Sequence, residues 1–160
     1  TLSHGLIDFR AKMPAGKGLW SGLWAVNPSG SNPQGEIDVQ EMLLGNTHTV
    51  YGSLHGWTPA PQWGQTMSTT MSADASQGFH DYQVVWQPGM LTWAIDGVAY
   101  AQYTKAQALA AHLPWPFDTA QGVYLIANLA VAAPSEWGGA PTQATTFPAT
   151  MEIQSIHVWE

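Results

Sequence analysis

The sequence predicts an all-β sandwich that forms one domain of 160 residues. Sixteen glycines and eleven prolines interrupt the chain, so that its apolar stretches are short. The pair Asp96-Gly97 stands between two apolar runs, which is a strong local signal for a β-hairpin. A chain of this length buries roughly 70% of its unfolded surface, so one domain can contain a complete core.

The first five strands are expected where short apolar stretches, several of them alternating with polar residues, lie between turn residues. A cluster of Pro, Gly, Ser and Asn at 27–33 closes the second of them. The fifth is a thin edge strand. We expect these strands at Gly5–Met13, Leu19–Val26, Gly35–Leu44, His48–His55 and Gln65–Met71.

The stretch 79–103 predicts a three-stranded antiparallel meander with turns at 87–89 and 96–97. An Ala-rich segment after it favours one short helix. Two further apolar stretches complete the predicted sandwich. The elements expected here are strands Phe79–Trp86, Met90–Ile95 and Val98–Tyr103, helix Lys105–His112, and strands Val123–Ala132 and Met151–Trp159.

Composition excludes several classes of function. Four Lys and Arg against eleven Asp and Glu give a net charge of -7, which disfavours a nucleic-acid partner. No stretch approaches the roughly 20 apolar residues of a membrane helix, and the absence of cysteine excludes disulfides and thiol chemistry. The chain opens with Thr1 and shows no signal peptide, so either a leader was removed or the chain is a piece of a longer protein.

The expected third strand carries the most informative cluster, in which Glu36, Asp38 and Glu41 fall within six residues. On a regular strand Glu36, Asp38 and Gln40 share one face, and Glu41 points the other way. One β-bulge between Asp38 and Glu41 turns Glu41 back toward the other two carboxyls. The intervening apolar residues Ile37, Val39 and Met42 predict that the opposite face is buried.

Three carboxyls on one face suit glycoside hydrolysis. A retaining glycosidase uses two carboxyls about 5–5.5 Å apart, one as nucleophile and one as acid and then base. Crowding of like charges should raise one pKa, and Glu41 is the candidate to stay protonated. Two other interpretations remain open for this motif: a solvated acidic edge strand, and an oxygen-rich calcium site.

Nine tryptophans exceed what a core of this size needs. Trp86, Trp93 and Trp159 lie within strand patterns, and we expect them in the core. Four others lie near Gly and Pro, where an indole either stacks on a sugar or anchors a loop; these are Trp57, Trp63, Trp115 and Trp137.

His55 closes the fourth strand beside the acidic one and is a candidate hydrogen-bond partner in a cleft. The six histidines show no metal-ligand spacing. Neither a phosphate-binding loop nor a G-x-S-x-G motif is present.

The acidic segment resembles the E-[I/L]-D-x-x-E signature of glycoside hydrolase family 16, in the branch with a bulge that includes laminarinases. The likeness extends over nearly the whole chain in family order. Segment 9–20 resembles "F-x-A-x-x-P-x-G-x-G-x-W", segment 79–97 resembles "F-H-x-Y-x-x-x-W…W-x-x-D-G", and segments 116–131 and 147–159 resemble the C-terminal strands.

This resemblance implies a β-jelly-roll of two antiparallel sheets with a concave glycan-binding cleft. It implies Glu36 as nucleophile, Glu41 as acid and base, and Asp38 as an assisting carboxylate. Together with the tryptophan pattern, it leads us to expect substrate contacts from Trp24, His55, Trp57, Asn128 and Trp137.

Four departures from the family pattern are visible. The N-terminal strands that usually precede this segment are absent, Asn32-Pro33 replaces a Trp-Pro, and "A-V-G-G" reads Ala130–Ala133. Gln154 stands where the family often has a calcium-binding Asp, so we predict no metal and no cofactor.

The resulting hypothesis is a retaining endo-β-glucanase that cleaves β-1,3 bonds in laminarin-like glucans. The resemblance implies an extracellular protein whose partner is a polysaccharide, and we expect a monomer. The alternatives are a mixed-linkage β-1,3-1,4-glucanase, a galactan-active member, a non-catalytic glycan-binding sandwich and a purely structural domain.

Overall fold

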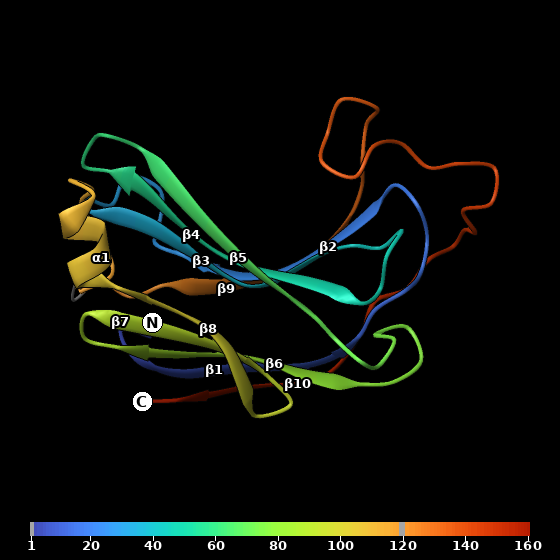
Figure 1. The fold of residues 1–160 in the computed structure, drawn as a ribbon, viewed down its shortest axis with the longest axis horizontal. Coiled ribbons are helices and arrows are strands. Elements are labelled where there is room, and N and C mark those ends of the chain that lie inside the picture. Colours follow the sequence, from blue (N-terminus) through green and yellow to red (C-terminus); the bar gives the residue numbers. More distant parts are fainter. Residues whose placement is uncertain (1, 119–120) are drawn as a thin grey trace.

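The computed structural model describes residues 2–118 and 121–160, which form two antiparallel sheets stacked face to face (Figure 1). The elements are β1 (Gly5–Lys12), β2 (Leu19–Val26), β3 (Gln34–Leu43), β4 (Thr49–Thr58), β5 (Trp63–Thr70), β6 (His80–Gln87), β7 (Met90–Ile95), β8 (Val98–Thr104), α1 (Lys105–Ala110), β9 (Tyr124–Val131) and β10 (Glu152–Trp159). One five-stranded sheet has the order β10-β1-β6-β7-β8, and the other has the order β5-β4-β3-β2-β9.

The predicted all-β sandwich is confirmed, and every strand expected from the sequence is present with small changes at its ends. The largest change is in β4, which continues to Thr58 because Gly56 still pairs with Trp63 of β5. Trp57 and Trp63 therefore lie in strands and not in a loop. The helix α1 is shorter than expected, and a capping box at Thr104 with Gln107 fixes its start.

The core fills the space between the two sheets. In β1 the alternation of the sequence places Ile7, Phe9 and Ala11 toward the other sheet, and all three are fully buried. Trp86 and Trp93 are in the core, as predicted. The prediction for Trp159 is wrong, because its register opposite Leu6 turns it to the outer face, where half of it is exposed.

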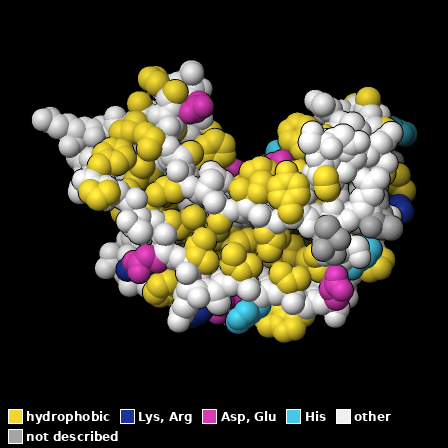
Figure 2. All heavy atoms as spheres, turned by 180° about the vertical axis from the view of Figure 1, so that it is seen from behind, with side chains coloured by type: hydrophobic (Ala, Val, Ile, Leu, Met, Phe, Trp, Pro, Cys, Tyr) yellow, Lys and Arg dark blue, Asp and Glu magenta, His cyan; other side chains and the backbone are white. Residues whose placement is uncertain are grey.

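Each sheet has two edge strands. The edge strands β5 and β8 contact each other across the sandwich, whereas the sandwich is open along the other two, β9 and β10. Ile156 and Val158 of β10 pair with the buried Phe9 and Ile7, yet they are 45% and 42% exposed. Figure 2 shows a band of hydrophobic side chains between the two layers on this side. We call this surface, formed by the inward faces of β9 and β10, the open edge.

Figure 1 shows the β5-β4-β3-β2-β9 sheet curving, with the chain after β9 rising at one end and α1 lying near the other. Within the described residues, no helix is long and apolar enough to cross a membrane.

The open edge predicts unequal effects of two matched truncations. Phe9→Ala removes a fully buried ring and should cost about 3–5 kcal/mol in the free energy of unfolding. Ile156→Ala, at the paired position of the neighbouring strand, should cost about 1 kcal/mol or less, because nearly half of that side chain already contacts water. Urea unfolding followed by tryptophan fluorescence measures both. Equal losses would mean that β10 is covered in solution.

Candidate active site

The backbone of β3 contains the bulge that the spacing of its acids predicts. Asp38 pairs with Ser53 of β4 and Glu41 pairs with Tyr51, so three steps along β3 match two steps along β4. The same extra residue occurs against β2, where Leu23 pairs with Gln40 and the next residue, Trp24, pairs with Asp38. Glu41 therefore returns to the face that carries Glu36 and Asp38.

The bulge directs two consecutive side chains, Val39 and Gln40, into the core. Both are buried, and Gln40 donates from Nε2 to Oγ of Ser21 at 2.9 Å. Gln40 thus leaves the face that it would share with the acids on a regular strand. In a bulge of this kind two neighbouring residues point to one side, so Glu41 takes the place on the other side that Gln40 would have on a regular strand.

A tryptophan of the opposite sheet holds the bulge. Trp93 of β7 is fully buried, and its Nε1 donates to the main-chain oxygen of Asp38 at 2.8 Å. A bulge interrupts the ladder locally, and this N–H supplies a donor to a buried carbonyl at that point. Gly52 of β4 makes the approach possible, because a Cβ there would lie 2.5 Å from the indole.

The carboxyls open into a cavity of about 200 Å³ on the face of the β5-β4-β3-β2-β9 sheet that points away from the core. Figure 2 shows the molecule hollowed between two lobes, with acidic and histidine side chains at the bottom of the hollow. Strands β2, β3 and β9 supply the walls of the cavity. The lining residues are Trp20, Gly22, Trp24, Glu36, Asp38, Glu41, Asn128 and Ala130.

Asp38 and Glu36 each have one specific partner from β4. His55 lies with Nε2 at 3.2 Å from Oδ2 of the buried Asp38. Trp57 donates from Nε1 to Oε2 of Glu36 at 3.3 Å, and its ring stacks on His55 with a centroid distance of 5.4 Å. His55 thus lies beside the carboxyls, and its contact with substrate stays a prediction. Trp57 holds Glu36 with its polar edge.

The three groups at this end of the site influence one another's protonation. Burial raises the pKa of Asp38, and the hydrogen bond with His55 opposes that rise. The same hydrogen bond raises the pKa of the His55 imidazole. Burial, followed by the charge of Asp38, raises the pKa of Glu36, while His55 and the Trp57 N–H lower it. The Asp38–His55 pair therefore favours the protonated form of the imidazole beside Glu36.

At the other end, burial raises the pKa of Glu41 to about 7, and the negative charge of Asp38 adds to the rise. The Ser53 hydroxyl, His55 and the Trp20 indole act in the opposite direction. The direction agrees with the sequence prediction, but the main cause is removal from water and only secondarily the crowding of like charges. Glu41 is thus a carboxyl that keeps its proton up to about pH 7.

Trp24 and Asn128 lie together at the wall of the cavity, as predicted, and they bind each other. Trp24 donates from Nε1 to Oδ1 of Asn128 at 2.8 Å. Gly22 leaves the space for this pair, because a Cβ at that position would lie 2.9 Å from the same oxygen. Asn128 fixes the plane of the Trp24 ring against the cavity.

Trp137 lies beyond the Glu41 end of the site, in the segment between β9 and β10. It is 40% exposed, and its ring contacts Tyr51 at 4.7 Å and Trp20 at 5.5 Å. The other two tryptophans predicted near loops are anchors. Trp63 donates to the carbonyl of Pro114 at 3.0 Å, and Trp115 packs on the core.

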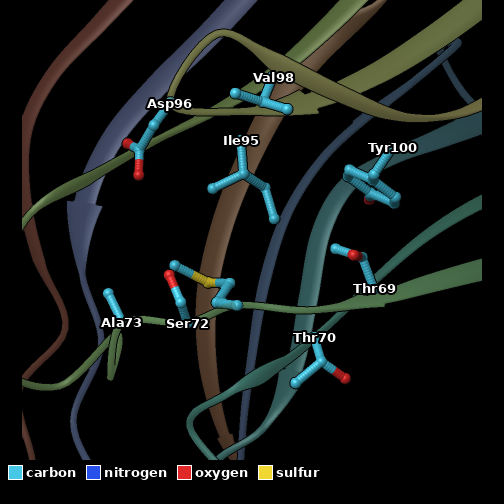
Figure 3. A pocket seen from close by; sticks show the side chains of 9 residues that line it. Thr69, Thr70, Ser72, Ala73, Ile95, Asp96, Val98 and Tyr100 are labelled. Atoms are coloured by element: carbon cyan, nitrogen blue, oxygen red, sulfur yellow. The ribbon is translucent and has the colours of Figure 1, made fainter.

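Two other possibilities arise from the structure: a cation held by residues of this site, and a ligand bound in another cavity. Among the described residues, one group of three donors, Glu36, Asp38 and His55, is near enough to share a cation, with atoms within 4.8 Å. Within this group, Nε2 of His55 lies 3.2 Å from Oδ2 of Asp38. A larger cavity of about 290 Å³ lies between β5 and the β7–β8 hairpin (Figure 3), but its one carboxylate, Asp96, is bound to His80 at 2.7 Å.

Comparison with known proteins agrees with this geometry. The model of the glycosyl hydrolases family 16 matches residues 1–147. The chain belongs to this family. It is 33% identical to glucan endo-1,3-beta-glucosidase A1 of Niallia circulans over all of the chain and 25% of that protein. It is 29% identical to a beta-glucanase of Rhodothermus marinus over 98% of the chain and 57% of that protein.

The solved catalytic domain of an endo-1,3-beta-glucanase (laminarinase) from Thermotoga petrophila RKU-1 superimposes with a TM-score of 0.86 at 35% identity. The alignment covers 99% of this chain and 64% of that one. The family 16 chain described here thus spans from a quarter to less than two thirds of the length of these three relatives.

Sequence reasoning missed three residues of this family 16 site: Trp20, Ser53 and Trp93. For Trp20 a signal was available, because Trp20, Gly22 and Trp24 alternate along β2 and must share the cleft face. Ser53 could have been found from its position two residues before His55 on β4. Trp93 had no local signal, since its partner Asp38 lies 55 residues away in the sequence.

A pair of substitutions separates the bulge from general packing. Trp93→Phe removes the donor to Asp38, and Trp86→Phe removes a similar donor, from a buried indole to the carbonyl of Phe117 at 3.1 Å. Each should cost about 1–3 kcal/mol in the free energy of unfolding. The titration of Glu41, followed by carbon-13 NMR of labelled glutamate carboxyls, should change only in Trp93→Phe, because only this variant loses the donor to the bulge. Equal changes in both would refute a specific role for Trp93.

Proposed function

We propose that this protein is a retaining endo-β-1,3-glucanase that hydrolyses laminarin-like glucans by double displacement. One observation carries the proposal: a single bulge brings three carboxyls to one concave face and leaves one of them, Glu41, with a pKa of about 7. The likeness to a glucan endo-1,3-beta-glucosidase and to a laminarinase supports β-1,3-glucan as substrate.

The environments assign the roles. Glu36 is the nucleophile, because the Trp57 N–H and the nearby imidazole of His55 favour its ionised form. Glu41 is the acid and base, because burial keeps its proton until about pH 7. Asp38 assists: its interaction with His55 keeps a partly positive ring beside Glu36.

In the first step the Glu36 carboxylate attacks the anomeric carbon, the glycosidic bond breaks, and the proton of Glu41 goes to the leaving oxygen. The ionised Glu41 then takes a proton from water, which attacks the same carbon and releases Glu36. Two inversions retain the configuration. Neutral glucan suits the tryptophan-lined cavity, because indole rings pack on the apolar faces of sugars while their N–H groups find polar partners.

We also propose that the protein acts outside the cell, since a large polymer must be cut before its fragments can enter. The hollow lies open between its two lobes (Figure 2), which fits attack within a chain and not at its end.

Carboxyl substitutions test the roles. Glu36→Gln and Glu41→Gln should each lower the release of reducing ends from laminarin by about 10²–10⁴-fold while circular dichroism stays native. Glu41→Gln should regain activity on a glucoside with an acidic phenol leaving group, which needs no proton, whereas Glu36→Gln should not. Glu152→Gln, in an exposed ion pair with Lys12, is the control. Retained laminarin cleavage in either active-site variant would exclude this function.

The pH profile of kcat/KM should be bell-shaped. The high-pH limb should fall near pH 7, because the reaction needs protonated Glu41 and this group loses its proton above its pKa. The low-pH limb should lie above 4.5, because Glu36 must be ionised and its pKa is raised from that value. Initial rates at low laminarin concentration measure both limbs. A flat profile between pH 6 and 9 would contradict the assignment of Glu41.

A panel of laminarin, mixed-linkage β-glucan and galactan, with sizing of the products, tests the sugar and the linkage. We expect internal cleavage of laminarin. Cleavage of another polymer alone would reassign the substrate within the family, and binding without any release of reducing ends would indicate a glycan-binding module.

A further inference from the structure

Glu41 belongs to a chain of hydroxyl groups that crosses two neighbouring strands. Ser53 of β4 donates from Oγ to Oε2 of Glu41 at 3.1 Å. The same Oγ lies 3.0 Å from Oγ1 of Thr66 on β5. Ser53 is fully buried and pairs with Asp38 on one side and Thr66 on the other, so the backbone register aligns Ser53 with Thr66. Glu41 pairs with Tyr51, and its side chain reaches Ser53 beyond the bulge.

Counting hydrogens gives this chain a direction. An ionised carboxylate only accepts, so the single hydroxyl hydrogen of Ser53 must go to Glu41, and Thr66 must then donate to Ser53. Thr66 is exposed at the edge strand β5, so its oxygen still reaches water. When Glu41 is ionised, the order of donation is therefore Thr66 to Ser53 to Glu41.

We propose that Ser53, oriented by Thr66, is a positioning residue that fixes the Glu41 carboxyl so that Oε1 carries the catalytic proton. This inference rests on the proposed function. Because Oε2 accepts from the hydroxyl, the carboxyl cannot rotate freely, and Glu41 is one of the residues that line the cavity. Proton transfer from an oxygen of fixed position is faster, because the entropic cost of orienting the donor toward the leaving group is already met by the fold.

The hydrogen-bonded chain Thr66–Ser53–Glu41, which we call the relay, also influences the pH at which Glu41 loses its proton. The groups that face Glu41 are Asp38 and Glu36 on its own strand, His55 and Tyr51 on β4, and Trp20 on β2. Asp38 opposes ionisation of Glu41, and His55 and Trp20 favour it. Ser53 donates to the ionised form and so favours it as well. Without Ser53, Glu41 should hold its proton to a higher pH.

The central variants are Ser53→Ala and Thr66→Val. Ser53→Ala should move the high-pH limb of kcat/KM upward by about one unit and lower kcat about tenfold with KM unchanged, since a hydrogen bond to a charged group is lost. The low-pH limb should stay in place. Thr66→Val keeps the shape of an exposed side chain and removes only its hydroxyl, and it should give a smaller shift in the same direction.

Three further variants complete the test. In the double variant, Thr66→Val should add nothing to Ser53→Ala, because the relay is already broken. Ser53→Thr keeps a hydroxyl and should return the limb to its wild-type position. Ser68→Ala is the matched control: Ser68 lies two residues from Thr66 on β5, is exposed, and should leave the profile unchanged.

A measurement without turnover separates this inference from the proposed function. Carbon-13 NMR of labelled glutamate carboxyls follows the titration of Glu41, assigned by the signal lost in Glu41→Gln. The pKa of Glu41 should rise in Ser53→Ala and, less, in Thr66→Val. If the Glu41 pKa rises in these variants but the wild-type protein does not hydrolyse laminarin, the relay is supported and the proposed glucanase function is refuted. If the wild-type protein hydrolyses laminarin but the Glu41 pKa is unchanged in both variants, the relay is refuted. Should Ser53→Ala fail to fold, the result for Thr66→Val alone is decisive.

Discussion

The hydrogen bond from the Trp93 indole to the main-chain oxygen of Asp38 joins the two sheets at the point where β3 bulges. Without the extra residue, the side-chain period of two would turn Glu41 into the core and Gln40 into the cleft. A carboxyl directed into the apolar interior, away from Ser53, would strongly oppose folding. The bulge therefore serves stability as well as the site, and the indole satisfies a buried carbonyl that an interrupted ladder cannot.

Much of the fold could be predicted because its causes are local. Alternation and the Asp96-Gly97 turn locate the strands, and the bulge itself follows from a change in spacing: Ile37 and Val39 are two apart, whereas Val39 and Met42 are three apart. The inward turn of Gln40 could not be read in this way. It depends on the Ser21 hydroxyl of β2, which offers a polar partner inside an otherwise apolar layer.

The carboxyl cluster was predictable because all of its members lie on one strand, so a single register fixes them together. The tryptophans lie on different strands and loops, and the face of each depends on pairing with a neighbour. Trp159 faces outward because β10 pairs with β1 in the register that sets it opposite Leu6. Trp57 lies in the site because β4 stays paired beyond the point where its sequence pattern ends.

Two glutamates on the same strand acquire different chemistry because the groups around them differ. Glu36 lies beside an imidazole that Asp38 holds, and an indole N–H reaches its carboxyl from β4. Glu41 is partly buried, and its polar partners are the hydroxyl of Ser53 and the indole of Trp20. Asp38 stands between them and repels both, but its link to His55 runs toward the Glu36 end. Burial therefore raises the pKa of Glu41 to about 7. The pKa of Glu36 is also raised by burial, but the His55 imidazole and the Trp57 N–H on β4 both oppose that rise.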